Sequence, residues 1–140
     1  GAVLLLATDA AVAKEFKAHG AHRTVDGHEV GADGMILDVW AATIAGFEKR
    51  LHTTRTLVWN GPFGAFETAP FDAGTVAAAK LVAQRTKSGD LLSVAGGGDT
   101  VAALSHRSSG PFIPDRFKSR RSFRIRIMLA VCNSWLFPNL

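Results

Sequence analysis

Four short apolar runs divide the first part of the chain, and polar or glycine-rich residues follow each of them. The runs cover residues 3–7, 35–39, 57–59 and 91–95. The apolar residues within each run are continuous and do not alternate with polar ones, which is typical of strands buried on both faces of a parallel sheet. The runs therefore predict the strands of such a sheet.

Segments of helical composition lie between the apolar runs, over residues 42–51, 75–85 and 100–105. In the second segment the apolar residues share one helical face, and basic residues near its end suit the helix dipole. Strands and helices that alternate at this spacing are typical of an α/β fold with right-handed crossovers. The predicted fold class is α/β, with a parallel sheet and flanking helices in three layers.

The composition agrees with one domain or one piece of a larger domain. The chain has 140 residues, 47% of them hydrophobic, which can supply a core. No apolar run approaches the roughly 20 residues of a membrane-spanning helix, and no basic residues precede the first run as they do in a signal peptide. A single cysteine, Cys132, excludes an internal disulfide and fits a reducing compartment. We expect a cytoplasmic protein with no membrane partner.

The ends of the predicted strands mark a candidate ligand site. Ligands of parallel α/β sheets bind outside the carboxyl ends of the strands. In this sequence the rule selects Thr8 and Asp9, residues 60–63 and residues 96–100. Because these strand ends are polar or rich in glycine, the sequence predicts a site along one edge of the sheet.

Three consecutive glycines, Gly96, Gly97 and Gly98, join a predicted strand to a predicted helix in the stretch SVAGGGDTVAAL. Glycines at such a turn allow backbone N–H groups to converge on a phosphate at the positive end of the helix. Asp99 is placed to coordinate Mg²⁺ directly or through water, but Asp99 or Thr100 can also serve only as a helix cap. The stretch is neither a Walker A loop nor a dinucleotide fingerprint, so a phosphate cradle and a plain capped turn are both open.

The stretch TLVWNGPFGAFETAPF contains a second group of candidate residues. The Asn-Gly-Pro sequence that begins at Asn60 makes a firm turn and ends a strand. Pro62 and Phe63 present apolar surface on which a planar base can rest, and Glu67 can accept hydrogen bonds from sugar hydroxyls. The alternative is that Phe63 and Phe66 belong to the core and that Glu67 is solvated.

Positive charge is concentrated at the end of the chain. Residues 1–105 hold nine basic residues and eleven acids, whereas residues 106–140 hold seven basic residues and the single acid Asp115, a net charge of +6. This segment offers an alternative function, a non-catalytic module that binds nucleic acid or an anionic surface. Few aromatic residues lie among its arginines, which argues against nucleic acid. Apolar and basic residues alternate over residues 123–127, and this short segment can form one amphipathic strand.

The family that these motifs resemble is phosphoglycerate kinase, in its C-terminal nucleotide-binding domain. The matching stretches are, in order, KEFKAHGAHRTVDG, MILDV, TLVWNGPFGAFETAPFDAGTVAAAK and SVAGGGDTVAAL. The resemblance covers about residues 2–104. It implies reversible phosphoryl transfer between 1,3-bisphosphoglycerate and ADP, which gives 3-phosphoglycerate and ATP in glycolysis. It also implies Mg²⁺ with ATP or ADP as ligands and a monomeric enzyme.

The resemblance also implies roles for individual residues. The family's loop around the nucleotide phosphates, with the metal near its aspartate, corresponds to Gly97, Gly98, Asp99 and Thr100. Glu67 matches the glutamate that contacts the ribose, and Asn60 matches the asparagine beside the phosphates. Pro62 and Phe63 match positions that wall the nucleotide pocket. No catalytic side chain is assigned.

Parts of the family pattern have no counterpart in this sequence. They are the N-terminal domain, which holds the phosphoglycerate, and the early half of the C-terminal domain. Where the family has Gly-Pro-Lys or Gly-Pro-Glu after the ILDV strand, this chain has Trp40, Ala41 and Ala42, which alters the loop beside the nucleotide. We expect an inactive fragment that keeps part of the nucleotide site and that binds phosphoglycerate only when the missing domain is supplied.

The resemblance ends abruptly near Leu104. This divides the chain into a partial nucleotide-binding domain over residues 1–104 and a divergent basic tail over residues 105–140. The family continues with another strand and a second glycine-rich loop, whereas the tail is rich in arginine and serine. A reading-frame change produces such a transition, so the tail is interpreted as a frame-shifted or disordered segment.

Overall fold

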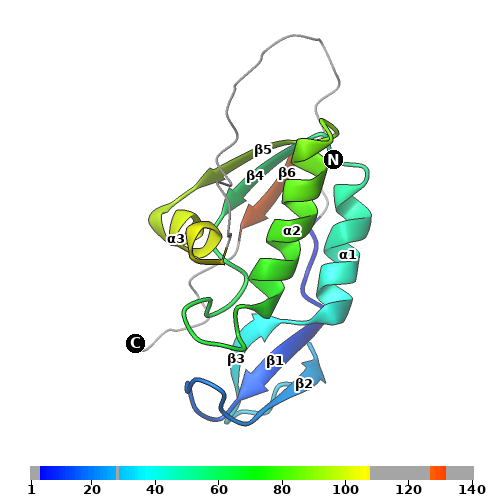
Figure 1. Ribbon diagram of the computed structural model, residues 1–140. Coiled ribbons are helices and arrows are strands. Elements are labelled where there is room, and N and C mark those ends of the chain that lie inside the picture. Colours follow the sequence, from blue (N-terminus) through cyan, green and yellow to red (C-terminus); the bar gives the residue numbers. More distant parts are fainter. Residues whose placement is uncertain (1–3, 28, 108–126, 132–140) are drawn as a thin grey trace.

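The computed structural model describes residues 4–27, 29–107 and 127–131. Its helices are α1 (Ala41–Leu51), α2 (Ala73–Lys87) and α3 (Gly98–Arg107). Its strands are β1 (Asp9–Ala13), β2 (His22–Asp26), β3 (Met35–Val39), β4 (Thr56–Asn60), β5 (Leu92–Gly96) and β6 (Ile127–Val131). Within the described residues these strands form two three-stranded sheets, drawn one above the other in Figure 1.

The upper sheet in Figure 1 is parallel and has β4 at its centre. β5 and β6 pair with β4 on either side, both in parallel. The strands predicted over residues 57–59 and 91–95 are confirmed as β4 and β5, with ends that differ by one residue. The predicted α/β class, with a parallel sheet and flanking helices, is confirmed.

The helices pack against one face of this sheet, and Figure 1 shows α1 and α2 side by side along it. Their core cluster joins side chains of all three helices to β4: Phe47, Leu51, Leu57, Trp59, Ala78, Val82, Leu91 and Leu104. Leu57 and Trp59 alternate with Val58, so one face of β4 enters the cluster. The predicted helices are confirmed, and each begins one or two residues earlier than expected. None of the helices in the described residues is long and apolar enough to cross a membrane.

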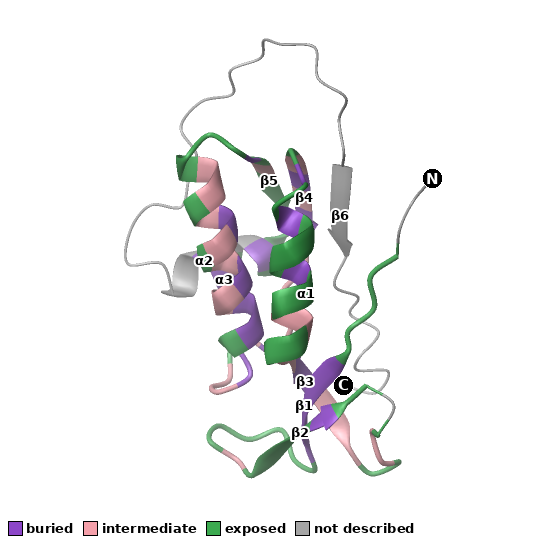
Figure 2. Cartoon of the chain, turned by 90° about the vertical axis from the view of Figure 1, so that its right-hand side faces the viewer, coloured by how far each residue is buried: buried purple, intermediate pink, exposed green. Residues whose placement is uncertain are grey.

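Most residues of β5 are exposed to solvent (Figure 2). Leu92 and Val94 expose 53% and 45% of their surface. The register places them beside Thr56 and Val58 of β4. The expectation that the strands are buried on both faces is wrong for β5, because the described helices pack on the other side of the sheet.

The lower sheet in Figure 1 is antiparallel, with β1 between β2 and β3. The strand predicted over residues 35–39 is confirmed as β3, but it does not join the parallel sheet, because it pairs with β1. The strand predicted over residues 3–7 is wrong for residues 4–7, which are exposed and outside any strand. β1 begins later, at Asp9, where five small residues are all buried. Sequence patterning missed β2 because only Val25 of that strand is buried.

Part of the basic tail also contributes to the fold. β6 lies beside β4 and extends the parallel sheet. Residues 108–126 and 132–140 lie outside the described residues, and so does most of the alternation predicted over residues 123–127. The structure therefore places one strand of the tail and leaves its proposed binding role untested.

Candidate functional site

The two motifs selected from the sequence meet at the carboxyl edge of the parallel sheet. β4 ends at Asn60 and β5 ends at Gly96, and these two residues are partners in the register of the sheet. Beyond the strands, the backbone N–H of Gly61 donates a hydrogen bond to Thr100 Oγ1 at 2.6 Å. Asn60 also lies against the glycines, since a Cβ on Gly97 would be 2.8 Å from Asn60 Oδ1. Motifs that are far apart in the sequence therefore form one candidate site (Figure 1).

The glycine loop, residues 96–98, supplies open space and backbone donors. Gly97 has a φ of +90°, a conformation that favours glycine. A Cβ on Gly96 or Gly98 would meet nothing within 4 Å, so these glycines leave a space that the turn itself does not require. α3 starts at Gly98, and the first N–H groups of a helix have no partner within the helix, so those of α3 begin at this exposed loop. The arrangement can hold an anion such as a phosphate.

Asp99 and Thr100 are neighbours with different surroundings. Asp99 is exposed in the first turn of α3, where its carboxylate can contact a cation bound to phosphates. Thr100 exposes 1% of its surface, and its hydroxyl accepts the hydrogen bond from Gly61. Among the described residues no group of three or more His, Cys, Asp or Glu side chains could hold a metal ion. A Mg²⁺ ion at Asp99 would therefore take most of its ligands from a nucleotide and water, as Mg²⁺ commonly does.

The Asn-Gly-Pro turn after β4 is held on both sides. Trp59 Nε1 donates a hydrogen bond to the carbonyl oxygen of Gly61 at 2.6 Å, while the N–H of Gly61 is bound to Thr100. Gly61 has a φ of +90°, and Pro62 follows it in a partly buried position. The turn is therefore fixed in place, with the exposed Asn60 side chain beside the glycine loop.

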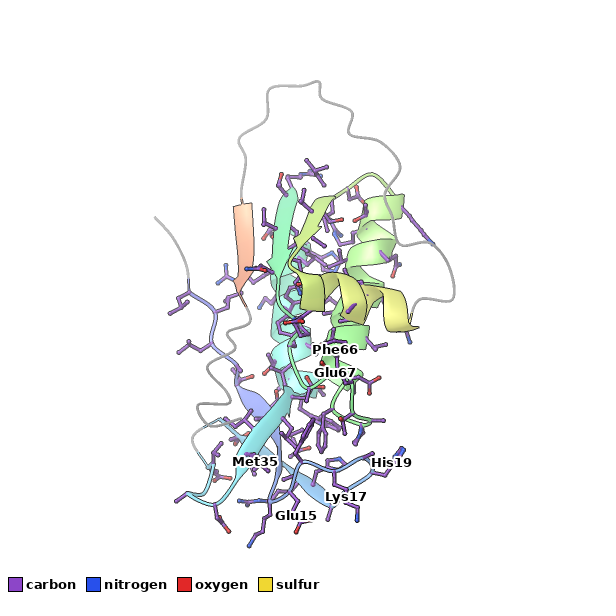
Figure 3. All side chains as sticks on the ribbon, turned by 90° about the vertical axis from the view of Figure 1, so that its left-hand side faces the viewer. Glu15, Lys17, His19, Met35, Phe66 and Glu67 are labelled. Carbon is purple, nitrogen blue, oxygen red and sulfur yellow. The ribbon has the colours of Figure 1, made fainter. Side chains whose placement is uncertain are left out.

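The β4–α2 loop, residues 61–72, carries two further predicted residues that lie in different surroundings. The ring of Phe63 lies 5.5 Å from the ring of Phe47 and 5.7 Å from that of Trp59, so it packs against the core. Glu67 is exposed, and Figure 3 shows it with Phe66 in the part of the loop below α3. The geometry supports a core role for Phe63 and leaves Glu67 accessible to a ligand.

A buried carboxylate lies behind the β4–α2 loop, and sequence patterning treated it only as part of an apolar strand. Asp38 is fully buried and accepts hydrogen bonds from the N–H groups of Gly74 at 2.7 Å and Val39 at 2.8 Å. Burial raises the pKa of Asp38 to about 7, although the two hydrogen bonds oppose this, and the charge of Asp72 raises it further. The signal available in the sequence is one acid inside the apolar run MILDV.

Thr8 and Asp9 do not join this site, contrary to the prediction. Asp9 begins β1 of the antiparallel sheet and Thr8 directly precedes it, so neither lies at the end of a parallel strand. The Asp9 carboxylate accepts hydrogen bonds from the N–H groups of Trp40, Ala42 and Thr43 and from the Thr43 hydroxyl. Burial alone would raise the pKa of Asp9, but these hydrogen bonds outweigh it and hold the pKa below its usual value. From a neighbouring strand, Asp9 therefore accepts hydrogen bonds from the N–H groups at the start of α1, while Trp40 is the N-cap residue of the helix.

Trp40, which departs from the family pattern, lies next to the antiparallel sheet. Its ring is 5.9 Å from the ring of His22, and it packs against a cluster that includes Ala65 and Phe71. Those two residues belong to the β4–α2 loop, so the tryptophan packs against a cluster that includes part of this loop.

The region that carries this site matches a known protein family. The phosphoglycerate kinase model matches residues 1–110. The chain belongs to the phosphoglycerate kinase family. The match extends a few residues beyond Leu104, where the motifs in the sequence ended.

Phosphoglycerate kinases of several bacteria are similar to most of the chain. That of Xanthobacter autotrophicus is 59% identical over 106 residues, which are 76% of this chain and 27% of that protein. That of Rhizorhabdus wittichii is 60% identical over 104 residues, 74% of this chain and 26% of that protein. The structure of phosphoglycerate kinase from Coxiella burnetii matches with a TM-score of 0.67 at 37% identity, over 73% of this chain and 25% of that one. The chain spans about a quarter of the length of these phosphoglycerate kinases.

Proposed function

We propose that this chain is the nucleotide-binding part of a phosphoglycerate kinase and that it holds the phosphates of ADP or ATP at the glycine loop. The observation that carries the proposal is the meeting of Asn60 with Gly97 at the carboxyl edge of the parallel sheet, beside the first turn of α3. Backbone donors at a helix N-terminus, with open space in front of them, suit a phosphate. Membership of the family makes a nucleotide the expected source of that phosphate.

Each predicted contact has a role in this proposal. N–H groups of the glycine loop and of Asp99 bind phosphate oxygens, and Asn60 lies beside them. The Asp99 carboxylate contacts Mg²⁺, which lowers the repulsion between phosphate charges. Thr100 supports the site from behind by holding the Asn-Gly-Pro turn. The ribose and base lie along the β4–α2 loop, near Glu67 and Pro62, while Phe63 supports the loop from the core.

The reaction proposed for the complete enzyme is phosphoryl transfer between 1,3-bisphosphoglycerate and ADP, giving 3-phosphoglycerate and ATP. Such a transfer depends mainly on holding both substrates in line and on stabilising charge. This chain supplies residues for the nucleotide and Mg²⁺, whereas the phosphoglycerate is bound by parts of the family that the chain does not match. We propose a monomeric cytoplasmic chain that is inactive by itself.

The isolated chain should bind MgADP without turning over substrate. Isothermal titration should detect one MgADP per chain, and a coupled assay with 1,3-bisphosphoglycerate should detect no ATP formation above background. Acyl-phosphate-dependent formation of ATP would contradict the proposed inactivity. The absence of any MgADP binding at millimolar nucleotide would contradict the proposed site.

Replacing Asp99 with asparagine should weaken the binding of MgADP by about 10-fold or more and leave the binding of metal-free ADP nearly unchanged. The reason is that the carboxylate acts on the metal and not on the nucleotide itself. D90N is the matched control, since Asp90 is an exposed acid outside the site whose carboxylate accepts a hydrogen bond from Ser88 Oγ at 2.8 Å. Titrations with and without Mg²⁺ test this, and an equal loss in both would rule out the metal role.

A further inference from the structure

The β4–α2 loop is attached to the end of β3 at two points. The N–H of Ala65 donates a hydrogen bond to the carbonyl oxygen of Leu37 at 2.8 Å. The N–H of Gly74, at the start of α2, donates a hydrogen bond to Asp38 Oδ2 at 2.7 Å. The segment that carries Glu67 therefore begins and ends against two consecutive residues of one strand.

The Asp38 carboxylate fills the space between these attachments. Its Oδ1 atom accepts a hydrogen bond from the N–H of Val39 at 2.8 Å. A Cβ on Gly64 would overlap this same oxygen, and a Cβ on Gly74 would lie 2.6 Å from it. Both glycines are thus in direct contact with the carboxylate, one from each end of the loop. The contact is tight enough that neither backbone segment can shift without leaving Asp38.

We propose that Asp38 is a positioning residue for the nucleotide site, holding the β4–α2 loop in the conformation that presents Glu67 to the ribose. This rests on the nucleotide site proposed above. Asp38 itself is fully buried, so it would act on the nucleotide only through other residues. It acts through the backbone of Gly64 and Gly74, and the charged group that bears on it is Asp72, at the end of the same loop.

The test replaces Asp38 with asparagine in the full chain at pH 8, where the carboxylate is mostly ionised. An amide has one acceptor oxygen, so its NH₂ group must face the N–H of either Val39 or Gly74, and one of the two hydrogen bonds that fix this side chain against the loop is lost. D9N is the matched control, because Asp9 is also a nearly buried carboxylate that accepts N–H groups at a helix start, but at α1 and away from the loop.

Two measurements report on the loop. The first is the Kd for 2′,3′-dideoxy-ADP divided by the Kd for ADP, a ratio that exceeds 1 when Glu67 contacts the ribose hydroxyls. We expect D38N to reduce this ratio at least about 5-fold, and D9N to leave it unchanged. The second is hydrogen exchange of the Ala65 amide, which we expect to accelerate at least about 10-fold in D38N while the Gly61 amide keeps its protection. If Asp38 only stabilised the fold, hydrogen exchange would change alike in D38N and D9N, and neither variant would alter the ribose ratio.

The outcomes separate this inference from the nucleotide proposal. If the wild type binds no MgADP, the proposed function fails, and the Ala65 exchange alone decides the role of Asp38. If D38N keeps both the ribose ratio and the Ala65 protection of the wild type, the inference is overturned. If D38N does not fold, G64A replaces it, because its methyl group displaces the loop from the same carboxylate. A G64A chain with an unchanged ribose ratio and unchanged Ala65 exchange would equally overturn the inference.

Discussion

The Gly97→Ala variant should bind MgADP at least about 30-fold more weakly than the wild type. The φ of +90° at this position is strained for alanine, at a cost of about 1–3 kcal/mol. The added Cβ would also lie 2.8 Å from Asn60 Oδ1, so the asparagine must move. Whether the loop changes its φ or Asn60 moves, the N–H groups and the amide no longer converge on one phosphate. Isothermal titration with MgADP measures the loss.

The matched control for this effect is G89A. Gly89 has a φ of +81° in the turn after α2, and a Cβ there would meet nothing within 4 Å. Urea unfolding should show a loss of about 1–2 kcal/mol in G89A from strain alone, with unchanged MgADP affinity. If G97A also kept the affinity of the wild type, the glycine loop would not be the phosphate site.

The second large effect is on the pH dependence of stability. Between pH 5 and pH 8 the free energy of unfolding of the wild type should fall by about 3 kcal/mol relative to that of D38N. The folded pKa of Asp38 is about 7, whereas its unfolded value is 3.8. In this interval the folded state keeps a proton that the unfolded state has released, so stability falls as the pH rises. Above the folded pKa the two states hold equal numbers of protons, and the decline ends.

Urea unfolding of both proteins at several pH values measures this difference. The asparagine of D38N does not titrate, so subtracting its curve removes the contributions of all other groups. Asp9 does not interfere, because its pKa is lowered and its contribution to stability is lost only as the pH falls below about 4. Parallel curves for the wild type and D38N would show that the buried carboxylate does not change its protonation in this range.

The fold could be predicted from the sequence where apolar residues form a continuous run or one face of a helix. Continuous apolar residues marked β4 and β5, and the apolar face of the second helix marked α2. The apolar pattern does not predict which strands pair, however. β3 was expected in the parallel sheet, but it is the antiparallel partner of β1. The run over residues 3–7 is more hydrophobic than β1, yet β1 forms the strand because its small residues fit between two neighbours.

The candidate site could be predicted as far as strand ends determine it. Parallel neighbours bring Asn60 and the glycine loop to one edge, and the sequence indicated both. The sequence could not show which side chains support the site from within the fold and which are free to contact a ligand. Thr100 is buried behind the site, Phe63 packs into the core, and Asp38 reaches the loop from another sheet. Such contacts depend on side-chain direction across separate elements, which no local pattern records.

The hydrogen bond between Gly61 and Thr100 bears on how variants of this site should be compared. It makes the Asn-Gly-Pro turn and the first turn of α3 one energetic unit. The effects of substitutions in the two segments should therefore not add, and a double-mutant cycle between them should show a coupling free energy of about 0.5–3 kcal/mol. Natural variation at one segment is best interpreted together with the residue found at the other.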